Sequence, residues 1–347
     1  MARILLDGVT VEHAGVAAIH DVTLAVEDRE LLVVIGPSGS GKTSLLRAVA
    51  GLDPPTGGEV LFDGVIVTRV PPSDRDIAMV FQDKSLIPFR SVRRNISFPL
   101  EVHHVERAEI DLRVVAEART VSVDRFLDAM PDHLAAGHQQ LVQAARALVR
   151  RPSVFLLDEP LARMDAAQRR TMRGEIRVLQ QGYGVTTIYA TNDQEDAMAL
   201  ADRIAVINDG RLRQVGTPDD IYRRPVDTFV AGFLGSPPMS FLEGDVSGLE
   251  VRIGAGTLPV PPQTPQGRVT VGIRAHDWDI VPAAGLLGVV TSVENHGDHE
   301  FTTVDLAGDP VVVRFDDGRP RPGDTIEIWT RRYHLFDRTG AAIAHIG

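Results

Sequence analysis

The chain has 347 residues, 44% of them hydrophobic, with no cysteine and a formal net charge of −11. This length favours two domains, the lack of cysteine excludes disulfides, thiolate metal sites and cysteine nucleophiles, and no apolar run approaches the ~20 residues needed to span a bilayer. The acidic balance disfavours broad nucleic-acid binding, which needs a basic face. Asp7 comes too early for a secretory signal, so we expect a cytoplasmic protein.

The first strong strand signal is the apolar run 31–36, which is followed by a Gly/Ser loop and a helical pattern that ends at Gly51. Another helical pattern covers 166–181. Short continuous apolar strands that alternate with helices are typical of a parallel sheet covered on both faces. The further strands of this predicted sheet are 76–81, 153–158, 185–191 and 203–208.

Two regions differ from this alternating pattern. Residues 91–150 contain few strand signals and are predicted to form a mainly helical insert. After GSPP at 235–238, Gly and Pro become frequent and short β-type runs follow one another without helices. We therefore expect an α/β domain at 1–235 and a small all-β domain, of barrel type, at 236–347.

The most specific motif is GPSGSGKT at 36–43, which fits G-x-x-x-x-G-K-[ST] and lies between a predicted strand and a predicted helix. Glycines let the backbone wrap a phosphate, and the amides of the helix N-terminus point at it. Lys42 is expected to reach the β/γ-phosphates, and the Thr43 hydroxyl to bind Mg²⁺. Lysine is rare here, since Lys42 and Lys84 are the only two among 36 basic residues. The alternative interpretation is a Gly-rich turn.

A second motif is VFLLDE at 154–159, where two carboxylates stand at the C-terminal end of a predicted buried strand. Buried strands avoid carboxylates, and in parallel sheets this end faces the ligand crevice. Asp158 is expected to hold Mg²⁺ through its water shell, and Glu159 to orient or activate the attacking water. The alternative is a polar strand end before Pro160.

Other short motifs accompany these two in a fixed order: VFQ at 80–82, LAAGHQQ at 134–140, LARMD at 161–165 and TND at 191–193. With this order and spacing the chain resembles the ATP-binding cassette (ABC) ATPases over essentially its whole length. Three further segments are similar to the maltose-type and glycerol-phosphate-type importer ATPases, namely 210–242, 271–277 and 333–337. The resemblance implies a P-loop NTPase fold: an ABC nucleotide-binding domain with a helical subdomain, followed by a C-terminal OB-like (TOBE) regulatory domain.

The resemblance also implies roles for single residues. Glu159, Gln82 and Asn192 would be catalytic, and Thr43, Gln82 and Asp158 would bind Mg²⁺. The nucleotide would be bound by His13, which would stack on adenine, by Asp165, which would reach across a dimer, and by Gly36, Pro37, Ser38, Gly39, Ser40, Gly41, Lys42, Thr43, Ser44, Ala135, Gly137 and His138. A surface histidine and an isolated loop acid are the alternatives for His13 and Asp165.

Two segments depart from the family pattern. The family reads Leu-Ser-Gly-Gly-Gln where this chain has Ala135, Ala136 and His138, so a hydroxyl is missing and a methyl is added beside the predicted γ-phosphate position. Asn192 stands where the family has a histidine. Gly137 and the expected helix start remain, so the helix dipole and some amide donors are retained.

The resemblance implies that ATP closes a dimer, of two identical chains or with another ABC ATPase, to energise an importer of a sugar or sugar-like compound. A permease subunit would dock near Leu86–Phe89 on the inner face of the membrane, and an extracytoplasmic solute-binding protein would act indirectly. The alternative for Leu86–Phe89 is core packing. The alternative function is a nucleotide-gated clamp or regulatory subunit with marginal hydrolysis.

Overall fold

The computed structural model describes residues 2–82, 86–280, 285–306, 308–316 and 320–347, and it divides between Pro218 and Asp219 into two compact units. This division precedes the expected 235/236 boundary, because helices α7 (Pro218–Arg223) and α8 (Thr228–Phe233) pack with the β-rich unit. In the described residues no helix is long and apolar enough to cross a membrane.

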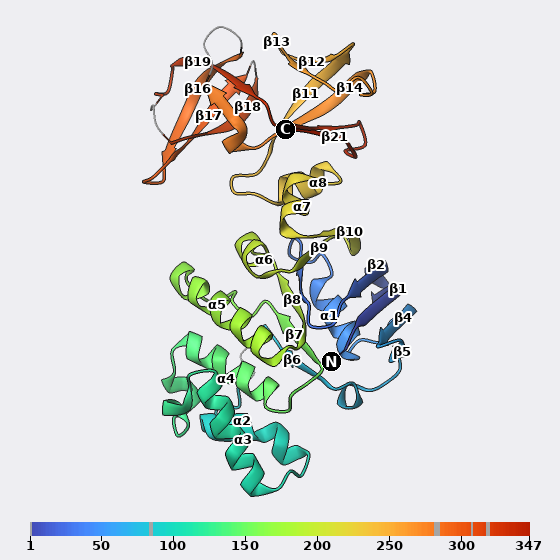
Figure 1. The fold of residues 1–347 in the computed structure, drawn as a ribbon, viewed down its shortest axis with the longest axis vertical. Coiled ribbons are helices and arrows are strands. Elements are labelled where there is room, and N and C mark those ends of the chain that lie inside the picture. Colours follow the sequence, from blue (N-terminus) through green and yellow to red (C-terminus); the bar gives the residue numbers. More distant parts are fainter. Residues whose placement is uncertain (1, 83–85, 281–284, 307, 317–319) are drawn as a thin grey trace. The chain divides into compact units, whose positions relative to one another are not determined.

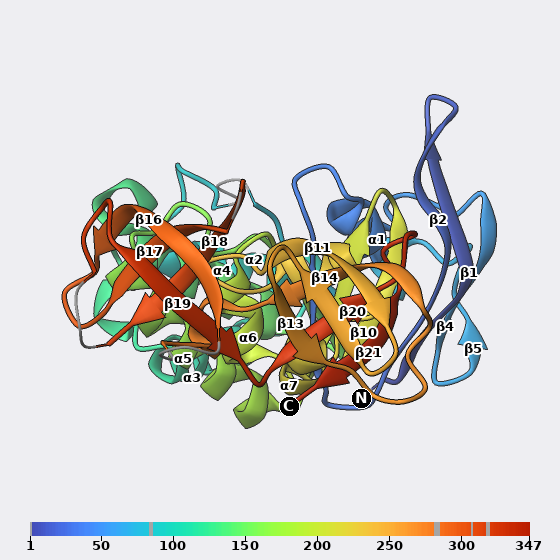
Figure 2. The ribbon, with the colours of Figure 1, turned by 90° about the horizontal axis from the view of Figure 1, so that it is seen from above.

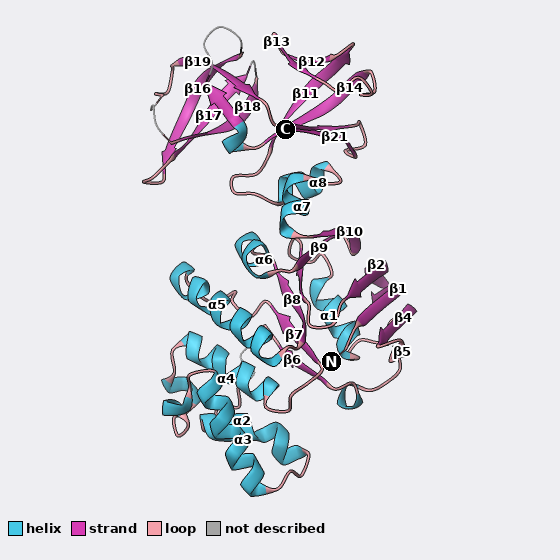
Figure 3. Ribbon diagram, viewed as in Figure 1, coloured by secondary structure: helices cyan, strands magenta, loops and turns pink. Residues whose placement is uncertain are grey.

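The centre of the N-terminal unit is a six-stranded sheet with the order β10-β9-β3-β8-β7-β6 (Figures 1 and 3). Five of its strands run parallel and β10 pairs antiparallel with β9. The strands are β3 (Leu31–Ile35), β6 (Ile77–Val80), β7 (Val154–Asp158), β8 (Thr186–Thr191), β9 (Arg203–Asn208) and β10 (Arg211–Gly216). The predicted parallel α/β sheet is confirmed, and β3, β7 and β8 are buried along their whole length.

A second, antiparallel sheet covers the phosphate-loop helix α1 (Lys42–Ala50) and was not predicted from the sequence. Its order is β2-β1-β4-β5, from β1 (Ile4–His13), β2 (Val16–Val26), β4 (Gly57–Phe62) and β5 (Val65–Ile66). Figure 2 shows the long β1–β2 pair at the edge of the unit. Apolar side chains of both sheets and of α1 form one core, so α1 is held between them.

The remaining helices of this unit lie beyond β6 and beside the parallel sheet. The region 91–150 contains α2 (Val92–Val102), α3 (Arg107–Thr120) and α4 (Ala136–Leu148), and the later helices are α5 (Ala166–Tyr183) and α6 (Gln194–Leu200). Short 3-10 helices occur at η1 (Pro72–Asp74), η2 (Asp124–Phe126) and η3 (Pro131–His133).

The C-terminal unit is all-β apart from its first two helices and η4 (Ala275–Asp277), and its strands form two sheets. The sheet β13-β12-β11-β14-β20-β21 contains β11 (Ser240–Ser247), β12 (Glu250–Ile253), β13 (Gly256–Pro259), β14 (Gly267–Ile273), β20 (Tyr333–Phe336) and β21 (Ala342–Ile346). The sheet β15-β19-β16-β17-β18 contains β15 (Trp278–Ile280), β16 (Leu286–Asn295), β17 (Glu300–Leu306), β18 (Asp309–Phe315) and β19 (Thr325–Thr330).

One buried arginine fastens α7 and α8 to these strands. Arg274, which is 3% exposed, follows β14 and donates hydrogen bonds to the carbonyls of Leu234 (2.6 Å) and Tyr222 (2.7 Å). Its guanidinium carbon also lies 3.6 Å from the centre of the Tyr222 ring. A cation held by two carbonyls and an aromatic face explains why these helices belong to the second unit.

Candidate functional site

The register of the parallel sheet brings three predicted site segments to one edge. Ile35 at the end of β3 pairs with Thr191 at the end of β8, and Asp158 at the end of β7 pairs with Ala190. The residues that follow these strand ends are therefore neighbours: the phosphate loop, Asn192 and Glu159. In parallel sheets the carboxyl ends of strands face the ligand crevice, so this edge is the candidate site.

The phosphate loop has a backbone that only glycine allows at two positions. Gly39 and Gly41 have φ of 80° and 103°, in the left-handed region. A Cβ atom on Gly41 would lie 2.4 Å from the Ala18 carbonyl oxygen, and one on Gly36 would lie 2.1 Å from that of Ile207. The loop is therefore clamped between β2 and β9, with the start of α1 open towards the site.

Lys42 is buried at the start of α1, and its ammonium group donates to the carbonyls of Gly36 and Pro37, both at 2.9 Å. Burial lowers the pKa of Lys42, while the carboxylates of Glu159 and Asp158 act in the opposite direction. The hydroxyl of Ser40 is buried without a hydrogen-bond partner among the described residues. A loop with a confined cation, an orphaned hydroxyl and a helix N-terminus fits a bound phosphate chain. Ser38 is exposed at the loop surface.

Two of the three predicted magnesium ligands, Thr43 and Asp158, are in contact. The Thr43 hydroxyl donates to Asp158 Oδ1 at 3.0 Å, and Asp158 is only 3% exposed. Burial raises the pKa of Asp158, and the hydrogen bond from Thr43 partly offsets this rise. A hydroxyl and a buried carboxylate beside a phosphate loop are ligands that Mg²⁺ prefers, so these residues fit the ion.

Glu159 and Gln82 contact each other at the same edge, with Gln82 Nε2 donating to Glu159 Oε2 at 2.9 Å. Glu159 has a φ of 44°, a strained value for a residue with a side chain, and its amide donates to the Ala190 carbonyl at 2.9 Å. Such strain is typical of functional positions. Here it occurs at the residue that directly follows β7.

His13 and Ser44 also contact each other, since His13 Nε2 lies 3.2 Å from Ser44 Oγ on the first turn of α1. The ring also lies 3.7 Å from a carboxylate oxygen of Asp53, which itself pairs with Arg47. His13 therefore stands beside the phosphate-loop helix with its side chain 51% exposed.

Asp165 and Asn192 differ in how they are held. Asp165 is the N-cap of α5, with its carboxylate accepting from the Gln168 amide at 2.8 Å. It is therefore more than an isolated loop acid, although it is exposed. The side chain of Asn192 is exposed and has no hydrogen-bond partner within the described part of the chain.

Residues 134–140, which depart from the family pattern, include the start of α4. Ala135 is the N-cap residue, and no side chain caps the helix in the described structure. Ala135 and Ala136 are exposed, Gly137 is half-buried, and the ring of His138 packs on Phe126 with centroids 4.6 Å apart. A cavity of about 60 Å³ lies between this helix and the Gln82–Glu159 pair, and it is lined by Gln82, Ala136, Gln139, Gln140, Gln143, Glu159, Pro160, Arg163 and Met164.

The predicted docking segment is split between core and surface. Leu86 is 8% exposed and packs inside, whereas Phe89 is 78% exposed. Between them the turn is held by Asn95, a fully buried side chain that bonds both the amide and the carbonyl of Ile87. Core packing thus accounts for Leu86 and leaves Phe89 as the exposed apolar residue.

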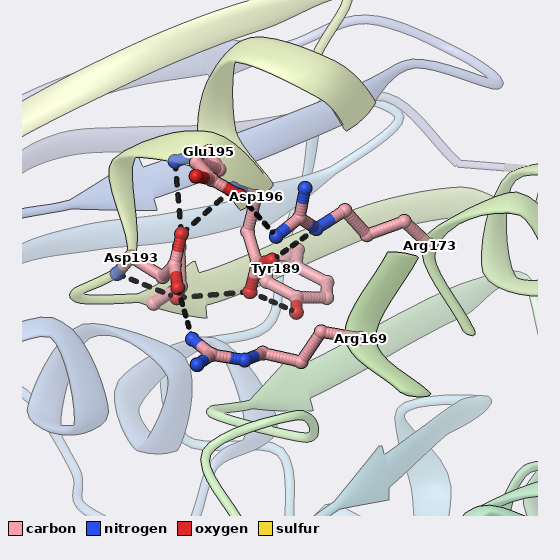
Figure 4. A network of polar contacts seen from close by, with 7 residues as sticks. Arg169, Arg173, Tyr189, Asp193, Glu195 and Asp196 are labelled. Carbon is pink, nitrogen blue, oxygen red and sulfur yellow. Dashed lines mark hydrogen bonds and ion pairs between the residues drawn. The ribbon is translucent and has the colours of Figure 1, made fainter. Parts of the chain in front are cut away.

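Sequence reasoning missed the ionic network that surrounds the Asn192 loop (Figure 4). Asp193 caps α6 by accepting from the amides of Glu195 (2.8 Å) and Asp196 (3.1 Å), and it pairs with Arg169 of α5. An Asp followed by two acids at a helix start is a readable N-cap signal. The partner arginine lies 24 residues earlier in the chain and gives no local signal.

Comparisons with known proteins agree with this geometry. The ABC transporter family model matches residues 19–162, and the TOBE domain model matches 271–336. The chain is 41% identical to the trehalose/maltose import ATP-binding protein MalK of Thermococcus litoralis, over 99% of this chain and 100% of that protein. It is 40% identical to the sn-glycerol-3-phosphate import ATP-binding protein UgpC of Ruegeria pomeroyi, over 99% and 100%.

Solved structures resemble somewhat less than two thirds of the chain. CbiO1 of Clostridium perfringens, part of the ABC transporter complex cbiONQ, matches with a TM-score of 0.59 and 25% identity, over 63% of this chain and 89% of that one. A dimeric ATP-binding cassette in a post-hydrolysis state with ADP and Pi matches with a TM-score of 0.56 and 28% identity, over 62% and 98%.

Proposed function

We propose that this chain energises the uptake of a sugar or sugar-like solute by ATP-driven dimer closure and hydrolysis. The premise is that the chain belongs to the family of ABC transporter ATP-binding proteins. The chain is 41% identical, over 99% of its length, to a trehalose/maltose import protein, and this identity supports a sugar as the solute. A second relative of equal coverage is named for sn-glycerol 3-phosphate, so a phosphorylated polyol belongs to the same range.

ATP binds at the carboxyl edge of the parallel sheet in this proposal. Loop amides and Lys42 hold the β- and γ-phosphates. Thr43 and Asp158 would hold Mg²⁺, which would supply positive charge beside the phosphates. Glu159 accepts a proton from the attacking water, and Gln82 keeps the Glu159 carboxylate in position through its 2.9 Å hydrogen bond. His13 contacts the adenine, and Asn192 donates a hydrogen bond to the γ-phosphate.

The dimer supplies the second half of each site. The start of α4, with Ala135, Gly137 and His138, covers the nucleotide bound to the partner subunit, and Asp165 reaches across the same interface. The permease docks on the surface that presents Phe89, because an exposed aromatic beside the helical insert suits a hydrophobic contact. The subunit therefore works on the inner face of the membrane, and a solute-binding protein acts on the opposite side.

Three relatives that match over 99% of the chain are named as import ATP-binding proteins, which favours the energising function over a regulatory clamp. The test is ATP hydrolysis by the full chain assembled with its permease and binding protein in liposomes. We expect maltose, trehalose or sn-glycerol 3-phosphate to stimulate hydrolysis and to accumulate inside. Hydrolysis that none of these solutes stimulates would contradict the proposed solute class.

A further inference from the structure

The loop that carries Asn192 is held on both flanks although Asn192 itself has an exposed side chain. On one flank, Thr191 ends β8 in register with Ile35, and its hydroxyl accepts from the Asp193 amide at 3.0 Å. On the other flank, Asp193 caps α6 and forms an ion pair with Arg169. The backbone on both sides of Asn192 is thus held by contacts of its neighbours.

A second set of contacts next to this loop centres on the buried carboxylate of Asp196 (Figure 4). Asp196, which is 2% exposed, accepts from the Tyr189 hydroxyl at 2.9 Å and from Arg173 Nε at 2.7 Å. The side chains of Arg169 and Asp193 are more open, at 32% and 20% exposure. A partly solvated ion pair contributes little to fold stability, so Arg169 can be changed without disrupting the contacts of Asp196 with Tyr189 and Arg173.

Arg169 also belongs to the first turn of α5, since its amide donates to the carbonyl of the N-cap residue Asp165 at 2.9 Å. The same short segment thus holds Asp165 and, through Asp193, the loop of Asn192. We propose that Arg169 is a positioning residue for ATP hydrolysis, which fixes Asn192 against the γ-phosphate and joins its loop to the Asp165 end of α5. This inference rests on the role of Asn192 in the proposed function.

The test is a double-mutant cycle on the full chain with Arg169→Ala, Asn192→Ala and the combined variant, measuring kcat and KM for Mg·ATP. Misplacing a catalytic group by about 1 Å costs up to roughly 10²-fold in rate, so we expect Arg169→Ala to lower kcat by at least about tenfold with KM nearly unchanged. In the Asn192→Ala background the same change should have almost no effect, because residues that act as a unit are not additive. Arg169→Lys should restore part of kcat.

Arg177→Ala is the matched control. Arg177 also lies on α5 and pairs with Asp202 at 2.6 Å, with exposures of 30% and 39%, but it does not contact the Asn192 loop. We expect its kcat to equal that of wild type. An equal loss of kcat in this control, multiplicative effects in the cycle, or an Asn192→Ala variant with wild-type kcat would each overturn the proposal. Wild-type hydrolysis that no solute stimulates would count against the transport function alone, because the cycle needs no solute.

Discussion

The phosphate loop and the start of α4 are the two surfaces expected to enclose one nucleotide, and they are built differently. In the loop, Lys42 donates to two carbonyls and Thr43 donates to Asp158. The charged side chains of Lys42 and Asp158 are both buried. At α4, the N-cap residue Ala135 offers no capping side chain, and it is exposed together with Ala136. The first surface is organised within one chain, whereas the second presents backbone amides and little else.

This difference indicates where the chemistry of the site is concentrated. A surface whose donors are already oriented loses little free energy of reorganisation when charge develops in the transition state. In the proposed dimer, the start of α4 would still contribute its dipole and backbone amides to a phosphate bound by the partner subunit. We therefore expect changes on the strand-edge side to have larger effects than changes at α4.

The largest effect is expected for Glu159→Gln. The substitution removes the proposed base but keeps an oxygen that accepts from Gln82, so hydrolysis should fall by roughly 10²–10⁴-fold while ATP-dependent dimers persist. Phosphate release and light scattering measure the two effects. If neither wild type nor variant associates in ATP, the dimer model is wrong.

Lys42→Ala should come next, because it removes the buried cation that is proposed to hold the phosphates. Each lost charge-assisted hydrogen bond is worth about 1.5–3 kcal/mol, so Mg·ATP affinity in calorimetry should weaken by roughly ten- to a hundredfold. Arg170→Ala, which removes an exposed positive charge on α5, serves as the control for net charge. Unchanged affinity in Lys42→Ala would contradict the phosphate-loop assignment.

Introducing the family's residues at positions 135, 136 and 192 should change the rate of hydrolysis by less, and it should raise the rate rather than lower it. Ala135→Ser with Ala136→Gly adds a hydroxyl and removes a methyl, and Asn192→His adds a longer, protonatable group. Each should raise phosphate release at saturating Mg·ATP, and the combined variant should exceed the product of the separate gains in a homodimer, because both act on one transition state. A combined variant no faster than wild type would mean that these residues do not limit turnover.

The same Ala135→Ser change also has an effect without nucleotide. Ser at an N-cap position typically stabilises a helix by about 1 kcal/mol relative to Ala. Thermal unfolding of the free chain should therefore show a small gain that is independent of any change in rate. No gain would mean that the new hydroxyl does not cap α4.

The smallest effect is expected from Asp158→Asn in the nucleotide-free chain. The pKa of Asp158 is raised above its ordinary 3.8 by burial, so ionisation favours the unfolded state as the pH rises from that value through the folded-state pKa. The variant, which cannot ionise, should be slightly more stable than wild type at pH 7 and equal to it below about pH 3.8. Denaturant unfolding at both pH values measures this difference.

Local patterns predicted the five parallel strands of the central sheet to within about one residue, but not the antiparallel strand β10. The run 153–158 is β7 (Val154–Asp158), and the helical pattern ending at Gly51 is α1, with Gly51 in the left-handed C-cap at φ 77°. β7 is a short continuous apolar run and α1 ends at a capping glycine, so run length and flanking residues identify these elements. The β1–β2 hairpin was missed because its inward and outward residues alternate irregularly across three register shifts.

The contacts that position the site come from distant parts of the chain and leave no local pattern. Leu86 and Phe89 look alike in the sequence, yet Asn95 turns the first inward and leaves the second outside. Arg169 is one of 34 arginines, and only its place on α5 opposite Asp193 distinguishes it. Tertiary pairing of this kind is invisible to propensity and periodicity.

Arg274 determines where the chain can be cut. An excised fragment that began at Ser236 would lack both carbonyls and the aromatic ring that hold this 3%-exposed guanidinium. Each lost hydrogen bond to the charge costs about 1.5–3 kcal/mol, a large share of a small domain's stability. A fragment that begins at Asp219 retains all three contacts, so excision there should preserve a cooperative melt that excision at Ser236 abolishes.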